Sequence, residues 1–324
     1  MHGFSDHCLL VLSVEEENWG PRLIRMLNCW ESFRGYRIFV EDKWRSFTLD
    51  GWGGYVLKEK FKLIKLALKD WHQRHTQNLS AKIVSIKDKI SILDLKGEST
   101  FLRDEEVEEL HGLTEELFSL SRINSSICWQ QSRSQWLCEG DANSKYFHAI
   151  MSGRRRGSAM SSFLVNGVLI DGVDNVCSVV FSHFSSLFKS RRVERPSLEA
   201  LQFQLLSYGE GISLVKPFSV EEVKAAVWDC DNFKCPGTDG VSFGFIKEFW
   251  NIICEDVMCF LVEFHRIGRL TKGINNPFIA LIPKVDSPQR LNDFRSISLV
   301  GSMYKILAKV LAKRLWLLKY CGWL

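Results

Sequence analysis

The feature that most constrains the fold is a long helical periodicity in the first half of the chain. Apolar residues recur at four-then-three spacing from Leu57 to Trp71, and a second series from Leu79 to Leu93 continues it one residue out of phase. Residues Lys96 to Thr100 predict a break, and the acidic residues 104–106 predict a capped start for a return helix with apolar positions from Val107 to Ile127. The pattern predicts an antiparallel helical hairpin whose simplest role is spacing and docking.

Short strands are expected beside the helices. The pair Asn166-Gly167 between two apolar triplets predicts a β-hairpin, and a helix over residues 173–189 should follow, with its Phe side chains filling a core. Ser219 and Glu222 form a capping box that predicts a helix start at Ser219. The remaining expected elements are a helix over 250–264, strands over 278–282 and 294–300, and a last helix over 304–318. The predicted fold class is therefore α+β and predominantly helical.

The composition is that of a soluble globular protein and excludes a disordered chain. Hydrophobic residues make up 46% and charged residues 25% of the 324 residues. The longest apolar run near the N-terminus is far shorter than the ~20 residues of a membrane span, so we expect no membrane partner. The ten Cys contain no C-x-x-C pair, which favours free thiols and an intracellular location in the nucleus or cytoplasm.

Charge is distributed unevenly along the chain. Residues 98–116 hold eight acidic residues against one Arg, whereas the part after Glu263 holds eleven Lys or Arg. Several of the latter alternate with aromatic residues, which favours weak, electrostatic binding of RNA or DNA. A solvated helix face is the alternative explanation for the basic residues of the last helix, which are Lys305, Lys309, Lys313 and Arg314.

Several motifs in a fixed order point to one family. In the last third of the chain they are Lys234-Cys-Pro-Gly-Thr-Asp-Gly240, Phe278-Ile-Ala-Leu-Ile-Pro-Lys284, Asn292-Asp-Phe-Arg-Ser-Ile-Ser-Leu299 and the stretch from Tyr304 to Leu315. Together they resemble the fingers of reverse transcriptases from plant non-LTR retrotransposons of the long interspersed element type. Upstream, Trp136–His148 looks like a W-L-x-x-G-D-x-N-T-K-F-F-H stretch of the same polyproteins, and Ser5-Asp6-His7 is similar to the closing part of their endonuclease.

The resemblance implies four consecutive parts of the chain. They are a C-terminal remnant of an endonuclease/exonuclease/phosphatase-like domain (residues 1–33), a helical linker (34–150), a connecting region with a β-hairpin and a helix (151–211), and the N-terminal fingers part of a reverse transcriptase domain (212–324). Family members continue into a palm whose aspartates bind two Mg²⁺, but no Y-x-D-D motif occurs in this sequence. We therefore expect a truncated RNA-directed DNA polymerase that lacks the palm and is inactive alone.

The resemblance also implies roles for individual fingers residues. Lys284 and Arg295 would contact the triphosphate of the incoming nucleotide, because Lys is a point charge and Arg a bidentate fork for phosphate oxygens. The loop that carries Lys234, Gly237 and Asp239 would lie near the template or the fingers backbone. These five residues are the expected binding residues for nucleotide or nucleic acid.

Asp6 and His7 would be the orienting and catalytic pair of the endonuclease remnant. Without the metal-binding carboxylates that the family places earlier, we expect this pair to be non-functional and no Mg²⁺ to bind productively. Two alternatives stay open, and the sequence sets no oligomeric state. One is a non-enzymatic helical interaction or nucleic-acid-binding protein, and the other is a zinc protein, although the spacing fits C-x-x-C poorly, with the ligands Cys230, Cys235, Cys254, Cys259 and His265.

Overall fold

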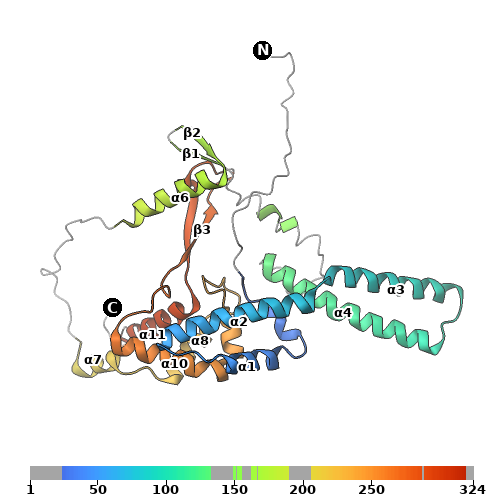
Figure 1. The fold of residues 1–324 in the computed structure, drawn as a ribbon, viewed down its shortest axis with the longest axis horizontal. Helices are drawn as coiled ribbons and strands as arrows, with labels where there is room; N and C mark the ends of the chain where they lie inside the picture. The colour runs from blue at the N-terminus through green and yellow to red at the C-terminus, as the bar shows by residue number, and fades with distance from the viewer. Residues whose placement is uncertain are drawn as a thin grey trace, which may run out of the picture. The chain divides into compact units, whose positions relative to one another are not determined.

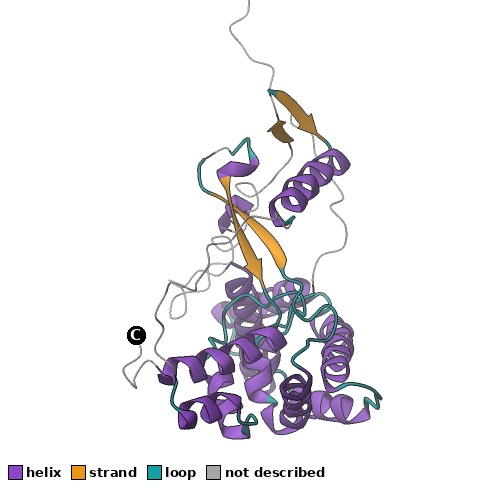
Figure 2. Cartoon of the chain, turned by 90° about the vertical axis from the view of Figure 1, so that its left-hand side faces the viewer, coloured by secondary structure: helices purple, strands orange, loops and turns teal. Residues whose placement is uncertain are grey.

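The computed structural model describes residues 24–132, 149–150, 152–154, 162–165, 167–189, 206–286 and 288–318. The chain divides into two compact units, each described here by itself. Among the described residues, the smaller unit comprises 162–165, 167–189, 283–286 and 288–294, and the larger comprises 24–132, 149–150, 152–154, 206–282 and 295–318. Helices dominate and the strands are short, so the predicted α+β, predominantly helical class is confirmed (Figure 2).

The elements follow the order expected from the sequence. In the larger unit the helices are η1 (Asn28–Ser32), α1 (Tyr36–Ser46), α2 (Gly53–Thr76), α3 (Leu79–Ser99), α4 (Asp104–Ser132), α7 (Tyr208–Val215), α8 (Val220–Trp228), α9 (Phe243–Glu248), α10 (Trp250–Ile267) and α11 (Ser302–Leu318). The smaller unit contains β1 (Ser162–Val165), β2 (Val168–Asp171), α6 (Val173–Phe188) and η3 (Leu291–Asp293). The strands β3 (Phe278–Pro283) and β4 (Phe294–Leu299) form a separate two-stranded sheet.

The predicted helical hairpin is present as α3 and α4, which lie side by side (Figure 1). The break that precedes it falls at Asn78, whose left-handed φ of 61° explains why the second apolar series is out of phase with the first. The predicted break at Lys96–Thr100 is wrong by several residues, because α3 runs through Gly97 to Ser99. Thr100 then donates its backbone N–H to the Lys96 carbonyl over 2.9 Å and so completes the last helical turn.

The core of the larger unit joins α1 and α2 to α8–α11. The apolar stripe of α2 is buried, with Leu57, Ile64 and Leu68 fully inaccessible, and α2 packs along α10 (Figure 1). The two backbones approach closely at Gly53, where a Cβ would lie 2.8 Å from the Cys259 carbonyl carbon. The segments expected as linker and fingers therefore share one hydrophobic core, while the predicted domain boundaries remain predictions.

The smaller unit contains the predicted β-hairpin and the helix after it. Antiparallel pairing joins Val165 to Val168 across the turn, where Gly167 adopts a φ of 82°. The expectation that the Phe residues of α6 fill a core is wrong in part, because Phe181 is 74% and Phe188 is 68% exposed. Over the described residues, no helix is long and apolar enough to cross a bilayer.

Only one of the two hydrogen bonds of the predicted capping box is present at the start of α8. Ser219 accepts a hydrogen bond from the Glu222 backbone N–H at 3.2 Å, as expected. The Glu222 carboxylate turns instead to Arg314 on α11, which donates two hydrogen bonds of 2.6 and 2.8 Å. Arg314 is 5% exposed, so the solvated-face explanation of this residue is wrong.

Candidate nucleic-acid interface

The loop between β3 and β4 fixes the backbone around Lys284. The Lys284 backbone N–H donates to the Asp293 carbonyl at 2.7 Å, and its ammonium donates to the Asn292 carbonyl at 2.9 Å. The Asp293 carboxylate accepts the backbone N–H groups of Gln289 and Arg290, and these bonds lower the pKa of Asp293. The exposed Lys284 head spends one of its three donors on the loop, so two remain for a phosphate.

Arg295 belongs to the larger unit and lies on β4. Its side chain is exposed, and Ile297, two residues along the same strand, is 42% exposed. Because alternate residues of a strand share one face, Arg295 and Ile297 present a mixed basic and apolar surface. Such a surface suits a nucleic acid, whose phosphates and bases are contacted by different side chains. Lys284 and Arg295 therefore have separate, exposed settings that each permit a phosphate contact.

The Lys234–Gly240 loop packs against the start of α11 on one side and against the residues before η1 on the other. A Cβ at Gly237 would lie 2.1 Å from the Val300 carbonyl oxygen, so only glycine permits this approach. Gly240 has a φ of 71°, and its carbonyl accepts the Met26 backbone N–H at 3.0 Å. The close approach at residue 237 and the left-handed backbone at residue 240 therefore explain why both positions are glycine.

Asp239 uses its carboxylate to hold the N-terminus of α11. One oxygen accepts both the backbone N–H and the hydroxyl of Ser302, the latter at 2.7 Å, and the other lies 3.3 Å from the Val241 nitrogen. This placement explains Asp239 and Gly237 by structure, and their contact with nucleic acid remains a prediction. Lys234 is exposed at the start of the same loop.

The lysines of α11 are engaged within the protein. Lys305 donates to the Cys235 carbonyl, and both Lys309 and Lys313 lie within 3.3 Å of the Asp229 carboxylate. These two lysines lower the pKa of Asp229, which caps the end of α8. The three lysines therefore pair with groups of the protein itself and do not form an unpaired basic face.

Three lysines that sequence reasoning did not single out lie near the Lys234–Gly240 loop. Lys58, Lys62 and Lys65 on α2 line a cavity of about 230 Å³ whose other wall includes Thr238 and Asp239. Their spacing of four and three residues was visible in the sequence, but it is the spacing of any solvated helix face. Only the packing of α2 against the loop identifies them.

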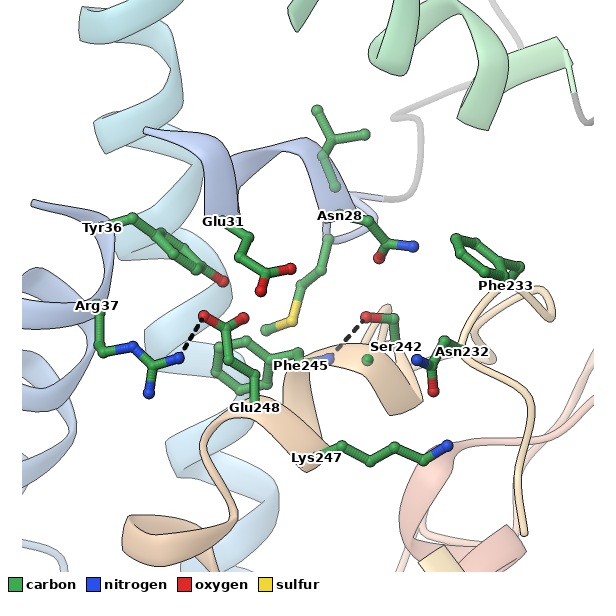
Figure 3. Close-up of a pocket in the computed structure, with 13 residues that line it drawn as sticks. Asn28, Glu31, Tyr36, Arg37, Asn232, Phe233, Ser242, Phe245, Lys247 and Glu248 are labelled. Atoms are coloured by element: carbon green, nitrogen blue, oxygen red, sulfur yellow. Dashed lines mark hydrogen bonds and ion pairs between the residues drawn. The ribbon is translucent and has the colours of Figure 1, made fainter. Parts of the chain in front are cut away.

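A second cavity, of about 380 Å³, lies between η1, α1 and α9 (Figure 3). Glu31 and Glu248 both line it, and Arg37 lies 3.6 Å from Glu248 (Figure 3). Burial, reinforced by the charge of Glu31, raises the pKa of Glu248 to about 7. Burial likewise raises the pKa of Tyr36 above its ordinary range. Two carboxylates, Glu31 and Glu248, and two cationic side chains, Arg37 and Lys247, therefore line this cavity.

The structure shows no cluster of metal ligands among the residues that it describes. No three His, Cys, Asp or Glu side chains gather there as a metal-ion site. The five predicted zinc ligands are among these residues and so form no such cluster. The predicted endonuclease pair, Asp6 and His7, lies outside the described residues.

Comparison with known proteins gives one relationship that spans most of the chain. The chain is 24% identical over 294 residues to the transposon TX1 uncharacterized 149 kDa protein of Xenopus laevis. The match covers 87% of this chain but 22% of that protein, so the chain spans about a fifth of its relative. No protein-family model matches the sequence. The similarity supports a transposon-related protein.

Proposed function

We propose that this chain is the fingers part of a non-LTR retrotransposon reverse transcriptase, preceded by the helical linker and the endonuclease remnant. The supporting observation is the similarity to a transposon protein over 87% of the chain, together with the fingers motifs in their family order between residues 234 and 315. The plant origin and the four domain boundaries rest on the motifs alone. On this proposal the part binds nucleic acid and depends on a palm for chemistry.

The proposed contacts are electrostatic and independent of one another. Lys284 keeps two free ammonium donors on an exposed loop, and Arg295 presents its guanidinium on the exposed face of β4. Each can neutralise one phosphate, which releases counterions and makes the affinity fall with salt. Lys234 is exposed in the first of the four motifs and adds a further positive charge. Base-specific readout is not part of the proposal.

The binding experiment measures RNA affinity across a salt series. A labelled single-stranded RNA is titrated with the full chain, and the slope of log affinity against log salt is compared with that of the variant Lys284→Ala/Arg295→Ala. Two lost phosphate contacts should reduce the slope by about 1 to 2 units, since each contributes about 0.7 on a single strand. A triple Ala variant of Lys305, Lys309 and Lys313 is the control, because those lysines already have partners within the protein.

Two results would contradict this placement. If the control variant loses more affinity than the pair variant, the basic face of α11 makes the contact instead. If neither variant changes the slope, the non-enzymatic interaction protein becomes the better interpretation.

A second experiment addresses the missing chemistry. Nucleotidyl transfer in the family needs Mg²⁺ held by palm aspartates, and the Y-x-D-D motif does not occur in these 324 residues. We expect the purified chain to leave a primer on an RNA template unextended with Mg²⁺ or Mn²⁺. Template-dependent incorporation of nucleotides would show that carboxylates elsewhere in the chain perform this role.

A further inference from the structure

We propose that the cavity lined by Lys58, Lys62 and Lys65 binds a phosphate of the nucleic-acid backbone, an inference that rests on the proposed nucleic-acid-binding function. The site lies on α2, within the segment whose simplest role was spacing and docking. It is separate from Lys284 and Arg295, and it would extend the binding surface of the larger unit beyond the fingers motifs.

The geometry gathers positive charge on one side of the cavity. The three lysines occupy positions i, i+4 and i+7 of α2, so they share one face of the helix beside its buried stripe. The rest of the lining combines the small residues Thr238, Gly273 and Gly301 with Asp239 and the apolar Phe61, Ile274 and Met303. Small residues leave space in which an oxyanion can approach the ammonium groups and the Thr238 hydroxyl.

Two of the lysine heads are held in place by main-chain carbonyls. Lys65 donates to the Asp239 carbonyl at 2.8 Å, and Lys58 donates to the Lys272 carbonyl at 3.1 Å. Each bond uses one of three ammonium donors, so both heads keep two donors. Burial lowers the pKa of Lys65, and a bound anion would relieve the cost of that burial.

The charge balance of the lining favours an anion. Three ammonium groups face one carboxylate, that of Asp239, which leaves a net charge of about +2. The Asp239 carboxylate already accepts hydrogen bonds from Ser302 and Val241. Lys62 also pairs with Glu59 at 3.2 Å, but its side chain is 61% exposed, and an ion pair that open to solvent contributes little.

A polymeric phosphodiester suits the surroundings better than a free anion. Lys62 is exposed, and so is Lys272, whose main-chain carbonyl accepts the Lys58 bond. A backbone that places one phosphate in the cavity would therefore lie near a further exposed lysine. Lysine as a compact point charge is a common phosphate ligand.

The test uses the full chain, a labelled single-stranded RNA and a salt series. The variant Lys58→Gln/Lys62→Gln/Lys65→Gln should lower the slope of log affinity against log salt by at least about 0.7, the value for one phosphate on a single strand. The matched control is Lys82→Gln/Lys87→Gln/Lys89→Gln on α3, which removes the same charge from exposed positions outside this cavity. The control should leave the slope within error of the wild-type value.

Because Lys65 holds the Lys234–Gly240 loop and Lys58 holds the main chain at Lys272, a single substitution guards against loss of folding. Lys62 pairs instead with Glu59 on its own helix, so Lys62→Glu should fold normally and should weaken RNA binding more than Lys82→Glu does. Circular dichroism melting checks both proteins. Equal effects of the two single variants, or of the two triple variants, would overturn the proposal.

Two further arms separate this proposal from its alternatives. If inorganic phosphate raises the melting temperature of the wild type but not of the cavity variant, while RNA slopes are equal, the site takes a free anion and the backbone proposal is overturned. If Lys284→Ala/Arg295→Ala lowers the slope but the cavity variant behaves like its α3 control, this inference fails and the proposed function stands. If the wild type does not bind RNA, the proposed function fails first.

Discussion

Arg314 offers the sharpest test of how the larger unit is held together. Its guanidinium donates to both Glu222 oxygens at 2.6 and 2.8 Å and to the carbonyls of Leu214, Lys216 and Pro217 at 2.6 to 3.1 Å. The guanidinium carbon also lies 4.3 Å from the centre of the Phe218 ring. One side chain thus ties α11 to the turn between α7 and α8.

The expected cost of Arg314→Met follows from what the substitution leaves behind. Met keeps the apolar volume but leaves a carboxylate and three carbonyls without their donor. Breaking a buried ion pair from one side costs about 3–5 kcal/mol. The Glu222 side chain is 20% exposed, so water compensates in part and the lower end, about 3 kcal/mol, is expected.

The assay is urea unfolding followed by tryptophan fluorescence, which reports on the larger unit because Trp30, Trp44 and Trp71 lie in its core. The control Arg45→Met removes an Arg that is 66% exposed and should change the free energy of unfolding by less than about 0.5 kcal/mol. The double variant Arg314→Met/Glu222→Gln should cost less than the sum of its single variants, because no unpaired carboxylate remains.

The pH dependence adds an independent check. Arg314 lowers the pKa of Glu222, so the stability that this pair contributes is present above the ordinary carboxyl pKa and is lost as the pH falls through the lowered value. The difference between wild type and Arg314→Met should therefore shrink in acid. A cost below about 1 kcal/mol, or strict additivity in the double variant, would refute the assignment of Arg314 as the tie.

Two further predictions concern the cavity of Figure 3 and the glycine loop. The folded pKa of Glu248 is about 7 and its ordinary value is 4.5, so the free energy of unfolding falls as the pH rises between these two values. Glu248→Gln should therefore be more stabilising at pH 8 than at pH 5, by about 2 kcal/mol in denaturant melts. Glu31→Gln should reduce this difference, because the charge of Glu31 helps to raise the pKa of Glu248. Gly237→Ala forces a Cβ to within 2.1 Å of the Val300 oxygen and should cost about 3 kcal/mol by thermal unfolding, whereas Gly209→Ala, which meets open space in α7, should cost nothing; equal effects would contradict the close approach.

The sequence predicted the elements well where their signal is local. The apolar series of α2 and the Asn166-Gly167 turn need only neighbouring residues to be recognised, and both are present. Gly97 shows the limit, because a glycine near a helix end permits a break without requiring one. The Ser99 and Thr100 hydroxyls then bond back to the Lys96 carbonyl and extend α3.

What the sequence could not show is which distant residues meet. Glu222 carries the local signal of a capping box, yet its carboxylate binds Arg314, 92 residues away. Arg314 in turn carries the local signal of a solvated helix position. The lysines of α2 and those of α3 look alike in sequence, and only the packing of α2 against the Lys234–Gly240 loop distinguishes them. The sequence therefore singled out the Lys234–Gly240 loop but not the α2 lysines that lie beside it.

The hydrophobic core that α1 and α2 share with α8–α11 divides the predicted linker into two parts with different roles. Its first part, α1 and α2, is bound to α10, since Lys60 and Trp44 both contact the Asp256 carboxylate at 2.8 to 3.0 Å. Its second part, α3 and α4, buries few side chains and leaves Ile92 and Phe118 mostly exposed. Spacing and docking therefore suit the α3–α4 hairpin alone. The α2 face is fixed against the loop through Lys65 and Asp239 and so belongs to one body with the segment that we propose as the fingers; this rigidity is what a phosphate site there would need.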